Sequence, residues 1–189
     1  MRILDNIYGV LFKPSSTFSE LPNRQYLGGS FLIVLLVSII NAMTEAAALN
    51  IGGVSVPILT LISVGFYLLF WIFSSLFLSF AADFMGGAGK ITDTMIGLAY
   101  ALLPTIFLGP LCILTNSLGM DETGIYNIFK ILIYLWTLSL IIISLKNAHR
   151  FHTTQAILSV LSIFFIILGL TFATIMLSVL GGAFYISIL

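Results

Sequence analysis

Residues 56–82 read VPILTLISVGFYLLFWIFSSLFLSFAA, a run of 27 residues without a charged side chain. The hydrocarbon core of a bilayer is about 30 Å thick, and an apolar helix of roughly 20 residues crosses it. A helix also satisfies its backbone hydrogen bonds within its own segment, as the lipid environment requires. The run therefore predicts a transmembrane helix.

Four further runs satisfy the same length requirement, at residues 29–49, 94–114, 128–145 and 156–180. Charged residues make up only 7% of the chain and hydrophobic residues 60%, whereas soluble domains carry roughly 25% charged residues. The sequence predicts an all-α integral membrane bundle of five transmembrane helices. The last run continues without charge through Gly181 and Gly182, so its end is the least defined boundary.

The positions of the basic residues predict the orientation of the bundle, because basic loops accumulate on the cytosolic side. Six of the seven precede the first run or lie in the second and fourth connections, at Arg2, Lys13, Arg24, Lys90, Lys146 and Arg150, and only Lys130 lies near the opposite end. We therefore expect a cytosolic N-terminus and a C-terminus outside. The seven basic and seven acidic residues cancel, so the net charge does not suggest a nucleic-acid partner.

The first 27 residues are expected to form a cytosolic or interfacial lead ahead of a membrane domain at 28–189. Residues 1–12 can form an amphipathic helix that lies in the membrane interface, with one apolar face made by Ile3, Leu4, Ile7, Tyr8 and Leu11. Pro14 ends it, and Thr17 and Glu20 have the spacing of a capping box for a second short helix. Packing over the mouth of the bundle and lipid sensing both remain open as roles of the lead.

The connection between the second and third runs, DFMGGAGKITD at 83–93, combines charged groups with three glycines. It does not fit a phosphate-binding loop, because Ile91 follows Lys90 where a serine or threonine is required, and Phe84 occupies the position of the first glycine. Gly86, Gly87 and Gly89 instead predict that the second helix ends in left-handed conformations and that the chain returns tightly into the third.

Asp83 belongs to a series of residues spaced by four that lies on one helical face: Ser75, Ser79, Asp83 and Gly87. Such a stripe in a membrane helix faces the bundle interior. An ionised carboxylate there needs a partner, which Lys90 or the basic fourth connection can supply. Two interpretations stay open, a structural ion pair and a contact to a ligand or ion.

Gly97, Ala101, Thr105 and Gly109 give the third run a small-residue seam that lets a neighbouring helix approach closely, and Ser38, Ala42 and Ala46 do the same for the first. Pro104 and the Gly109-Pro110 pair interrupt the third run. Interrupted helices line binding sites in many transporters. The third run therefore predicts an assembly seam and leaves transport as the alternative.

Three other features have mainly structural interpretations. Glu45 and Lys130 can form an interhelical ion pair at the outer end of the bundle if their helices are neighbours. His149 and His152 lie on one helical face, but they lack a third ligand, so we expect no bound metal and no cofactor. The sequence lacks the zinc-protease and serine-nucleophile motifs, and we expect no enzymatic activity.

Four short motifs along the chain resemble the Yip family of five-span membrane proteins. They are Leu11-Phe12-Lys13-Pro14 followed by Thr17-Phe18, Asp83 with Gly86, Gly87 and Gly89, Tyr100-Ala101 with Pro104, and His149 with Phe151. The resemblance implies a cytosolic N-terminus, as the basic residues do. Eukaryotic members bind Rab-type GTPases through a long N-terminal region that this chain lacks, so it is more similar to a compact prokaryotic member, and we do not expect GTPase binding.

The sequence thus predicts a non-enzymatic scaffold or adaptor in a prokaryotic cell membrane. Its expected partners are the lipid bilayer and further copies of itself or other membrane proteins. The alternative is a small-solute or ion transporter with a cytosol-facing polar cavity near Asp83. We expect ligand or partner contacts at Asp83, Gly86, Gly87, Gly89, Lys90, Tyr100, Pro104 and His149.

Overall fold

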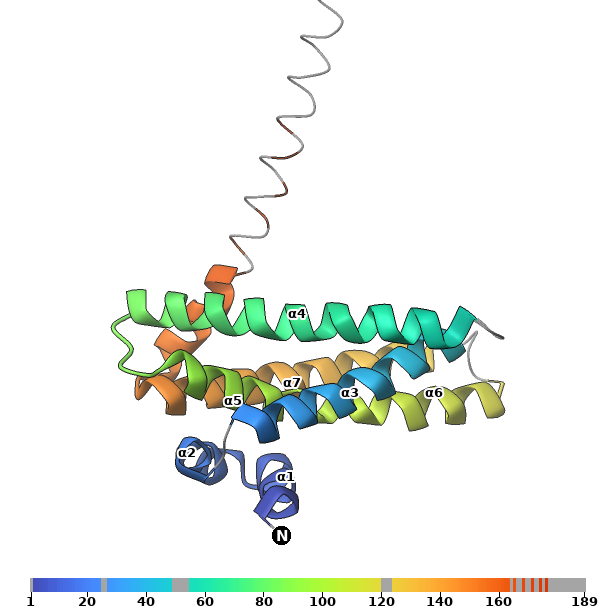
Figure 1. Cartoon of the computed structure of the whole chain (residues 1–189), viewed down its shortest axis with the longest axis horizontal. Coiled ribbons are helices and arrows are strands. Elements are labelled where there is room, and N and C mark those ends of the chain that lie inside the picture. The colour runs from blue at the N-terminus through green and yellow to red at the C-terminus, as the bar shows by residue number, and fades with distance from the viewer. Residues whose placement is uncertain are drawn as a thin grey trace, which may run out of the picture.

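The computed structural model describes residues 2–24, 27–48, 55–119 and 124–163, together with positions 165, 168, 171, 174 and 176. Throughout this part of the chain the regular structure is helical (Figure 1). The elements are α1 (Arg2–Phe12), α2 (Pro14–Arg24), α3 (Leu27–Ala48), α4 (Ser55–Phe84), α5 (Ile91–Ala101), η1 (Leu103–Phe107), α6 (Leu108–Ser117) and α7 (Ile125–His149). A further helix follows at Thr153–Ile163.

Four segments are long and apolar enough to cross a membrane: Leu27–Ala46, Val56–Phe84, Ile91–Ser117 and Ile125–His149. They correspond to the first four predicted runs, with ends that differ by a few residues. The all-α membrane bundle is therefore confirmed, with four candidate spans among the described residues. Twelve of the 25 residues of the expected fifth span at 156–180, and the whole tail that follows it, lie outside the described residues.

The third span, made of α5, η1 and α6, lies at the centre of the bundle. It packs against α3, α4 and α7, and it is the most buried of the four spans, whereas α4 is the least buried. Figure 1 shows these long helices running side by side, with α4 along one edge. The small residues of the third run make this central place possible, because they let its neighbours approach closely.

The third span is broken once, at η1. Pro104 has no backbone N–H and cannot continue the α-helical hydrogen bonding, so residues Leu103–Phe107 form a 3₁₀-helix instead. The N–H of Thr105 donates to the carbonyl oxygen of Leu102 at 3.0 Å. The expected second interruption, at Gly109-Pro110, is absent from the structure. Pro110 lies in the first turn of α6, where its missing N–H would have no helical partner.

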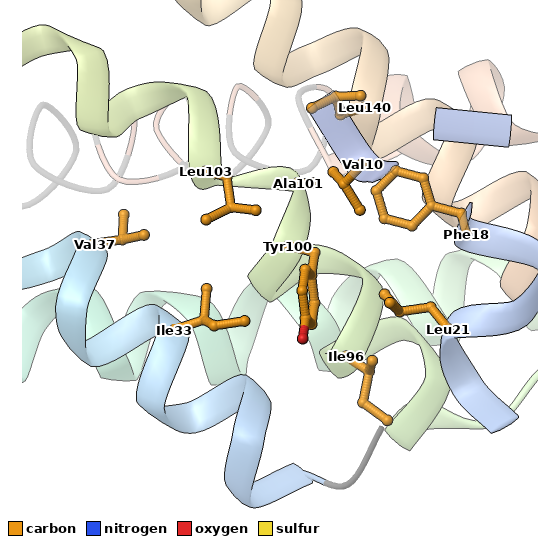
Figure 2. Packing of buried hydrophobic residues seen from close by; sticks show 10 residues of the cluster. All are labelled: Val10, Phe18, Leu21, Ile33, Val37, Ile96, Tyr100, Ala101, Leu103 and Leu140. Carbon is orange, nitrogen blue, oxygen red and sulfur yellow. The ribbon is translucent and has the colours of Figure 1, made fainter. Parts of the chain in front are cut away.

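The lead folds into two short helices that run across the direction of the long ones (Figure 1). Val10 of α1 and the α2 residues Phe18 and Leu21 are fully buried against the bundle. Figure 2 shows Tyr100 of α5 between Leu21 of α2 and Ile33 of α3. The lead therefore shares one hydrophobic core with the third span.

The start of α2 differs from the expected capping box. Pro14 is the first residue of α2, a position that suits proline because its fixed backbone angle is helical and no N–H is needed. Thr17 already lies inside the helix, and its hydroxyl donates to the carbonyl oxygen of Lys13 at 2.9 Å. Thr17 therefore cannot act as the N-cap.

The expected apolar face of α1 is divided between two surroundings. Ile7 and Leu11 pack partly against the core, whereas Leu4 and Tyr8 are 72% and 61% exposed. Phe12 continues the exposed stripe, and its ring lies 4.8 Å from that of Tyr8 between centroids. One side of α1 thus packs against the bundle, and an exposed apolar stripe of Leu4, Tyr8 and Phe12, the α1 stripe, faces away from it.

Candidate functional site

The glycine-rich connection forms a tight turn between α4 and α5, and we call residues 85–90 the junction. Gly86 has a φ of +83°, a left-handed conformation that glycine adopts without steric cost. The N–H of Gly87 then donates to the carbonyl oxygen of Ala82 at 2.9 Å. The junction thereby ends α4 in the way that the sequence predicts for Gly86.

Gly87 and Gly89 serve a different purpose from the one expected, because neither has a positive φ. A Cβ atom on Gly87 would lie 2.7 Å from His149 Nδ1 and 2.7 Å from Phe151 Cε1. A Cβ atom on Gly89 would collide with the backbone carbonyl of Ala148. Both glycines are therefore required by the close approach of the C-terminal end of α7.

The C-terminal end of α7 packs directly against the junction. Arg150 adopts a left-handed conformation with a φ of +55°, and it turns the chain so that the rings of His149 and Phe151 stack with centroids 5.5 Å apart. The N–H of Ala88 donates to the carbonyl oxygen of His149 at 3.2 Å. Gln155 donates from Nε2 to the carbonyl oxygen of Met85 at 3.0 Å, so the helix after α7 is also fastened to the junction.

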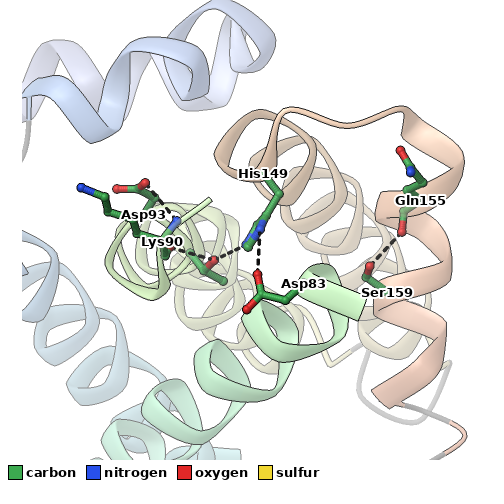
Figure 3. A network of polar contacts seen from close by, with 7 residues as sticks. Asp83, Lys90, Asp93, His149, Gln155 and Ser159 are labelled. Atoms are coloured by element: carbon green, nitrogen blue, oxygen red, sulfur yellow. Dashed lines mark hydrogen bonds and ion pairs between the residues drawn. The ribbon is translucent and has the colours of Figure 1, made fainter. Parts of the chain in front are cut away.

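His149 connects three helices at this end of the bundle (Figure 3). Its side chain is fully buried, and Nε2 lies 2.9 Å from the hydroxyl of Thr94 in α5. Its Nδ1 lies 3.8 Å from Oδ1 of Asp83 in α4, and the Asp83 side chain is 57% exposed. Together, Asp83, Thr94 and His149 can hold the ends of α4, α5 and α7 in register. The Asp83 carboxylate of this group is exposed.

The predicted polar stripe on α4 is present. Ser75 and Ser79 are buried, and Asp83 follows them at the exposed end of the helix. The basic side chain nearest to the Asp83 carboxylate is His149 at the end of α7, and neither Lys90 nor a basic residue of the fourth connection pairs with it among the described residues. Lys90 is exposed, and its backbone N–H donates to Oδ2 of Asp93 at 3.4 Å. In the part of the chain that the structure describes, no group of three or more His, Cys, Asp or Glu side chains is placed to hold a metal ion.

The structure brings together most of the expected site residues but separates two of them. The junction glycines, Asp83 and His149 meet at one end, with Lys90 at its edge. Tyr100 instead lies fully buried under the lead, and Pro104 is buried at the break of the third span. These two residues belong to the core of the bundle.

The surface beside Asp83 is apolar. An open groove of about 400 Å³ runs along α4 from this carboxylate, and the other residues that line it are Phe73, Leu76, Phe77, Phe80 and Ile91. A single carboxylate at the rim of a phenylalanine-lined groove lacks the converging polar groups of a solute site. The geometry at this end is that of an apolar surface with one carboxylate at its rim.

Comparison with known proteins agrees with this architecture. The sequence pattern that defines the Yip1 domain matches residues 8–186. The chain belongs to the Yip1 family. No curated protein and no solved structure matches it. The Yip1 family is in general a non-enzymatic membrane family, and the apolar helices of this member make it an integral membrane protein.

The far end of this Yip1 bundle contains a polar group that sequence analysis missed. Asn41 of α3 donates from Nδ2 to Thr105 Oγ1 at 2.9 Å and to the carbonyl oxygen of Val37 at 3.0 Å. Tyr67 of α4 donates to Glu45 Oε1 at 2.9 Å. The signal in the sequence was the spacing of Asn41 and Glu45, four residues apart in an otherwise apolar run.

The expected ion pair between Glu45 and Lys130 is wrong. Glu45 binds Tyr67, and Lys130 Nζ lies 5.9 Å and 6.0 Å from the ring centroids of Tyr126 and Tyr134. The reason is the helix order, because α3 packs mainly against α4 and the third span, whereas α7 packs mainly against the third span and α2. The condition that these two helices be neighbours is not met.

The small-residue seam of the third run is largely used within the Yip1 bundle itself. A Cβ atom on Gly97 would collide with the Ser144 side chain of α7. One on Gly109 would lie 2.9 Å from Thr44 Oγ1 of α3. The seam therefore assembles the chain's own helices, and its far end, around Gly109, borders an open groove.

Proposed function

We propose that this Yip1 family member is a membrane scaffold or adaptor that associates laterally with further copies of itself or with other membrane proteins. In this proposal the junction and the lead face the cytosol of a prokaryotic cell, in accord with the positions of the basic residues. Binding of a GTPase is not part of the proposal, because α1 and α2 are short and pack against the bundle.

The observation that carries the proposal is an open groove of about 370 Å³ between α3 and α6. Thr44, Gly109 and Cys112 are buried at its floor, whereas Met43 and Ile113 at its rims are 58% and 67% exposed. A floor of small residues between apolar rims lets the backbone of another membrane helix approach closely, and such approach drives helix association in lipid. We call this the α3–α6 groove.

The packing of the interior supports association over transport. Between the junction and the break of the third span, the α5 residues Leu98, Ala99, Tyr100 and Ala101 are each at most 5% exposed. The indole N–H of Trp71 donates to the carbonyl oxygen of Met95 at 3.1 Å and ties α4 to the same helix. A solute moving from Asp83 toward Thr105 would have to displace this apolar packing.

Cysteine crosslinking in native membranes tests the proposal. Cys112 is the only cysteine, so a Cys112→Ala chain accepts one new cysteine at a time. Ile113→Cys places a thiol on the rim of the α3–α6 groove, and Leu61→Cys is a matched control on α4, since the native side chains are 67% and 74% exposed. We expect crosslinked adducts of the chain at position 113 and few at position 61. Equal yields at the two positions, or none at 113, would contradict association through this groove.

A further inference from the structure

A small cavity lies beside the break of the third span, separate from the α3–α6 groove and from the junction. Its volume is about 170 Å³, and it is bounded by α3, α4, α7 and the segment around η1. Tyr67, Phe70 and Tyr134 supply aromatic walls, and Asn41, Thr105 and Thr137 supply polar groups. Polar side chains cost free energy when they are buried at membrane depth, so a cluster of them marks a candidate functional site.

Three polar residues that line the cavity use their protons in hydrogen bonds within the protein. The hydroxyls of Thr105 and Thr137 donate to the carbonyl oxygens of Leu102 at 2.7 Å and Ile133 at 2.9 Å. Tyr67 donates its proton to Glu45. These three hydroxyls therefore have only lone pairs left to offer.

Asn41 adds another acceptor. Its Nδ2 atom uses both protons, on the Val37 carbonyl oxygen and on Thr105 Oγ1. The bond to a carbonyl oxygen fixes which side of the amide is the nitrogen, because only the NH₂ group can donate there. The amide oxygen of Asn41 is thus left as an acceptor in a cavity that this residue lines.

The electrostatics of the cavity favour a positive ligand. Glu45 lies one hydrogen bond away from the lining, on Tyr67. Aromatic faces attract cations, and two or three rings around an ammonium group are the usual recognition device for it. Tyr134 already attracts one cation in this way, the Nζ atom of Lys130.

We infer that this cavity binds a small organic ammonium ion. Its acceptors, aromatic walls and nearby carboxylate all complement such a cation, and a cavity of about 150 Å³ is large enough for a six-carbon ring. A quaternary ammonium ion with five to seven heavy atoms has a comparable size. This inference does not depend on the proposed scaffold function.

The test measures binding of choline to the full-length protein in lipid nanodiscs by calorimetry, with sodium chloride at equal ionic strength as the blank. Its neutral carbon isostere, 3,3-dimethylbutan-1-ol, is the matched probe. We expect saturable choline binding and an affinity for the isostere that is about tenfold weaker or more. Absence of saturable choline binding, or equal affinity for the two probes, would overturn the inference.

Three variants locate the site. Glu45→Gln should weaken choline binding about tenfold, because it removes the compensating charge, whereas Asp5→Asn, the same change at an exposed position of α1, should leave it unchanged. Lys130→Gln should strengthen binding about threefold by removing a competing cation. A gain of affinity cannot come from partial unfolding, so this variant stays informative if Glu45→Gln is less stable. Unchanged affinity in both Glu45→Gln and Lys130→Gln would place any choline elsewhere and refute the site.

Discussion

Replacing Gly87 by alanine should destabilise the junction although the backbone there tolerates a side chain. The φ of Gly87 is not positive, so the cost comes from space alone. The new Cβ atom would lie 2.7 Å from both His149 Nδ1 and Phe151 Cε1 and 2.9 Å from His149 Cβ. His149 cannot move away easily, because its ring is buried and held by Thr94.

The size of the effect follows from these contacts. Forcing an extra methyl group into a packed site costs about 1–3 kcal/mol, and contacts on two fixed rings place Gly87→Ala near the middle of that range. A loss of about 2 kcal/mol corresponds to a Tm lower by roughly 6 °C for a chain of this size. Gly65→Ala is the control, because a Cβ atom there meets nothing within 4 Å and alanine is favoured over glycine inside a helix.

Thermal unfolding in detergent, followed by tryptophan fluorescence, measures both variants. A double-mutant cycle with Phe151→Ala then tests the cause, since that change removes one of the two contacting rings. We expect the combined cost to be about 1 kcal/mol less than the sum of the single costs. A Tm for Gly87→Ala equal to that of Gly65→Ala, or additive costs in the cycle, would refute the explanation.

Three further predictions concern other parts of the chain. Thr94→Val should lower the free energy of unfolding by about 1–3 kcal/mol, because it leaves buried His149 without its hydroxyl partner; Thr92→Val, at an exposed position, is the control, and equal stabilities would contradict the role of this bond. Asn41→Leu should cost about 0.5–1.5 kcal/mol in the same assay, the usual range for interhelical hydrogen bonds in membranes, and a cost below that range would show that the Asn41 bonds contribute little. We expect the α1 stripe to lie in lipid, so in a Cys112→Ala chain a charged maleimide should react several times more slowly with Leu4→Cys than with Asp5→Cys. Equal reaction rates would place the stripe in water.

The length and ends of the long helices were predictable because lipid imposes a simple rule on the sequence. A segment without charges and of sufficient length must be helical, so the first run, expected at 29–49, appears as Leu27–Ala48. Pro104 likewise marks the break of the third span through its missing N–H. These properties depend on one segment at a time.

The contacts between helices were much less predictable. His149 was expected among the residues of the site, but its bond to Thr94 depends on how α5 and α7 pack, which spacing along the chain does not reveal. The two junction glycines differ in the same way. The left-handed turn at Gly86 follows from the local backbone preference of glycine. The need for glycine at position 87 arises from the rings of His149 and Phe151, which lie 62 and 64 residues later in the sequence.

Accessibility of the bundle interior tests most directly whether this Yip1 protein associates laterally or carries solute through its interior. In a Cys112→Ala chain in sealed vesicles, Ala99→Cys places a small thiol at a fully buried position of α5, and Asp83→Cys provides an exposed reference. We predict that a small membrane-impermeant thiol reagent modifies position 83 and leaves position 99 unmodified from either side. Modification of position 99 at a rate close to that of position 83 would contradict the closed interior on which the scaffold account depends.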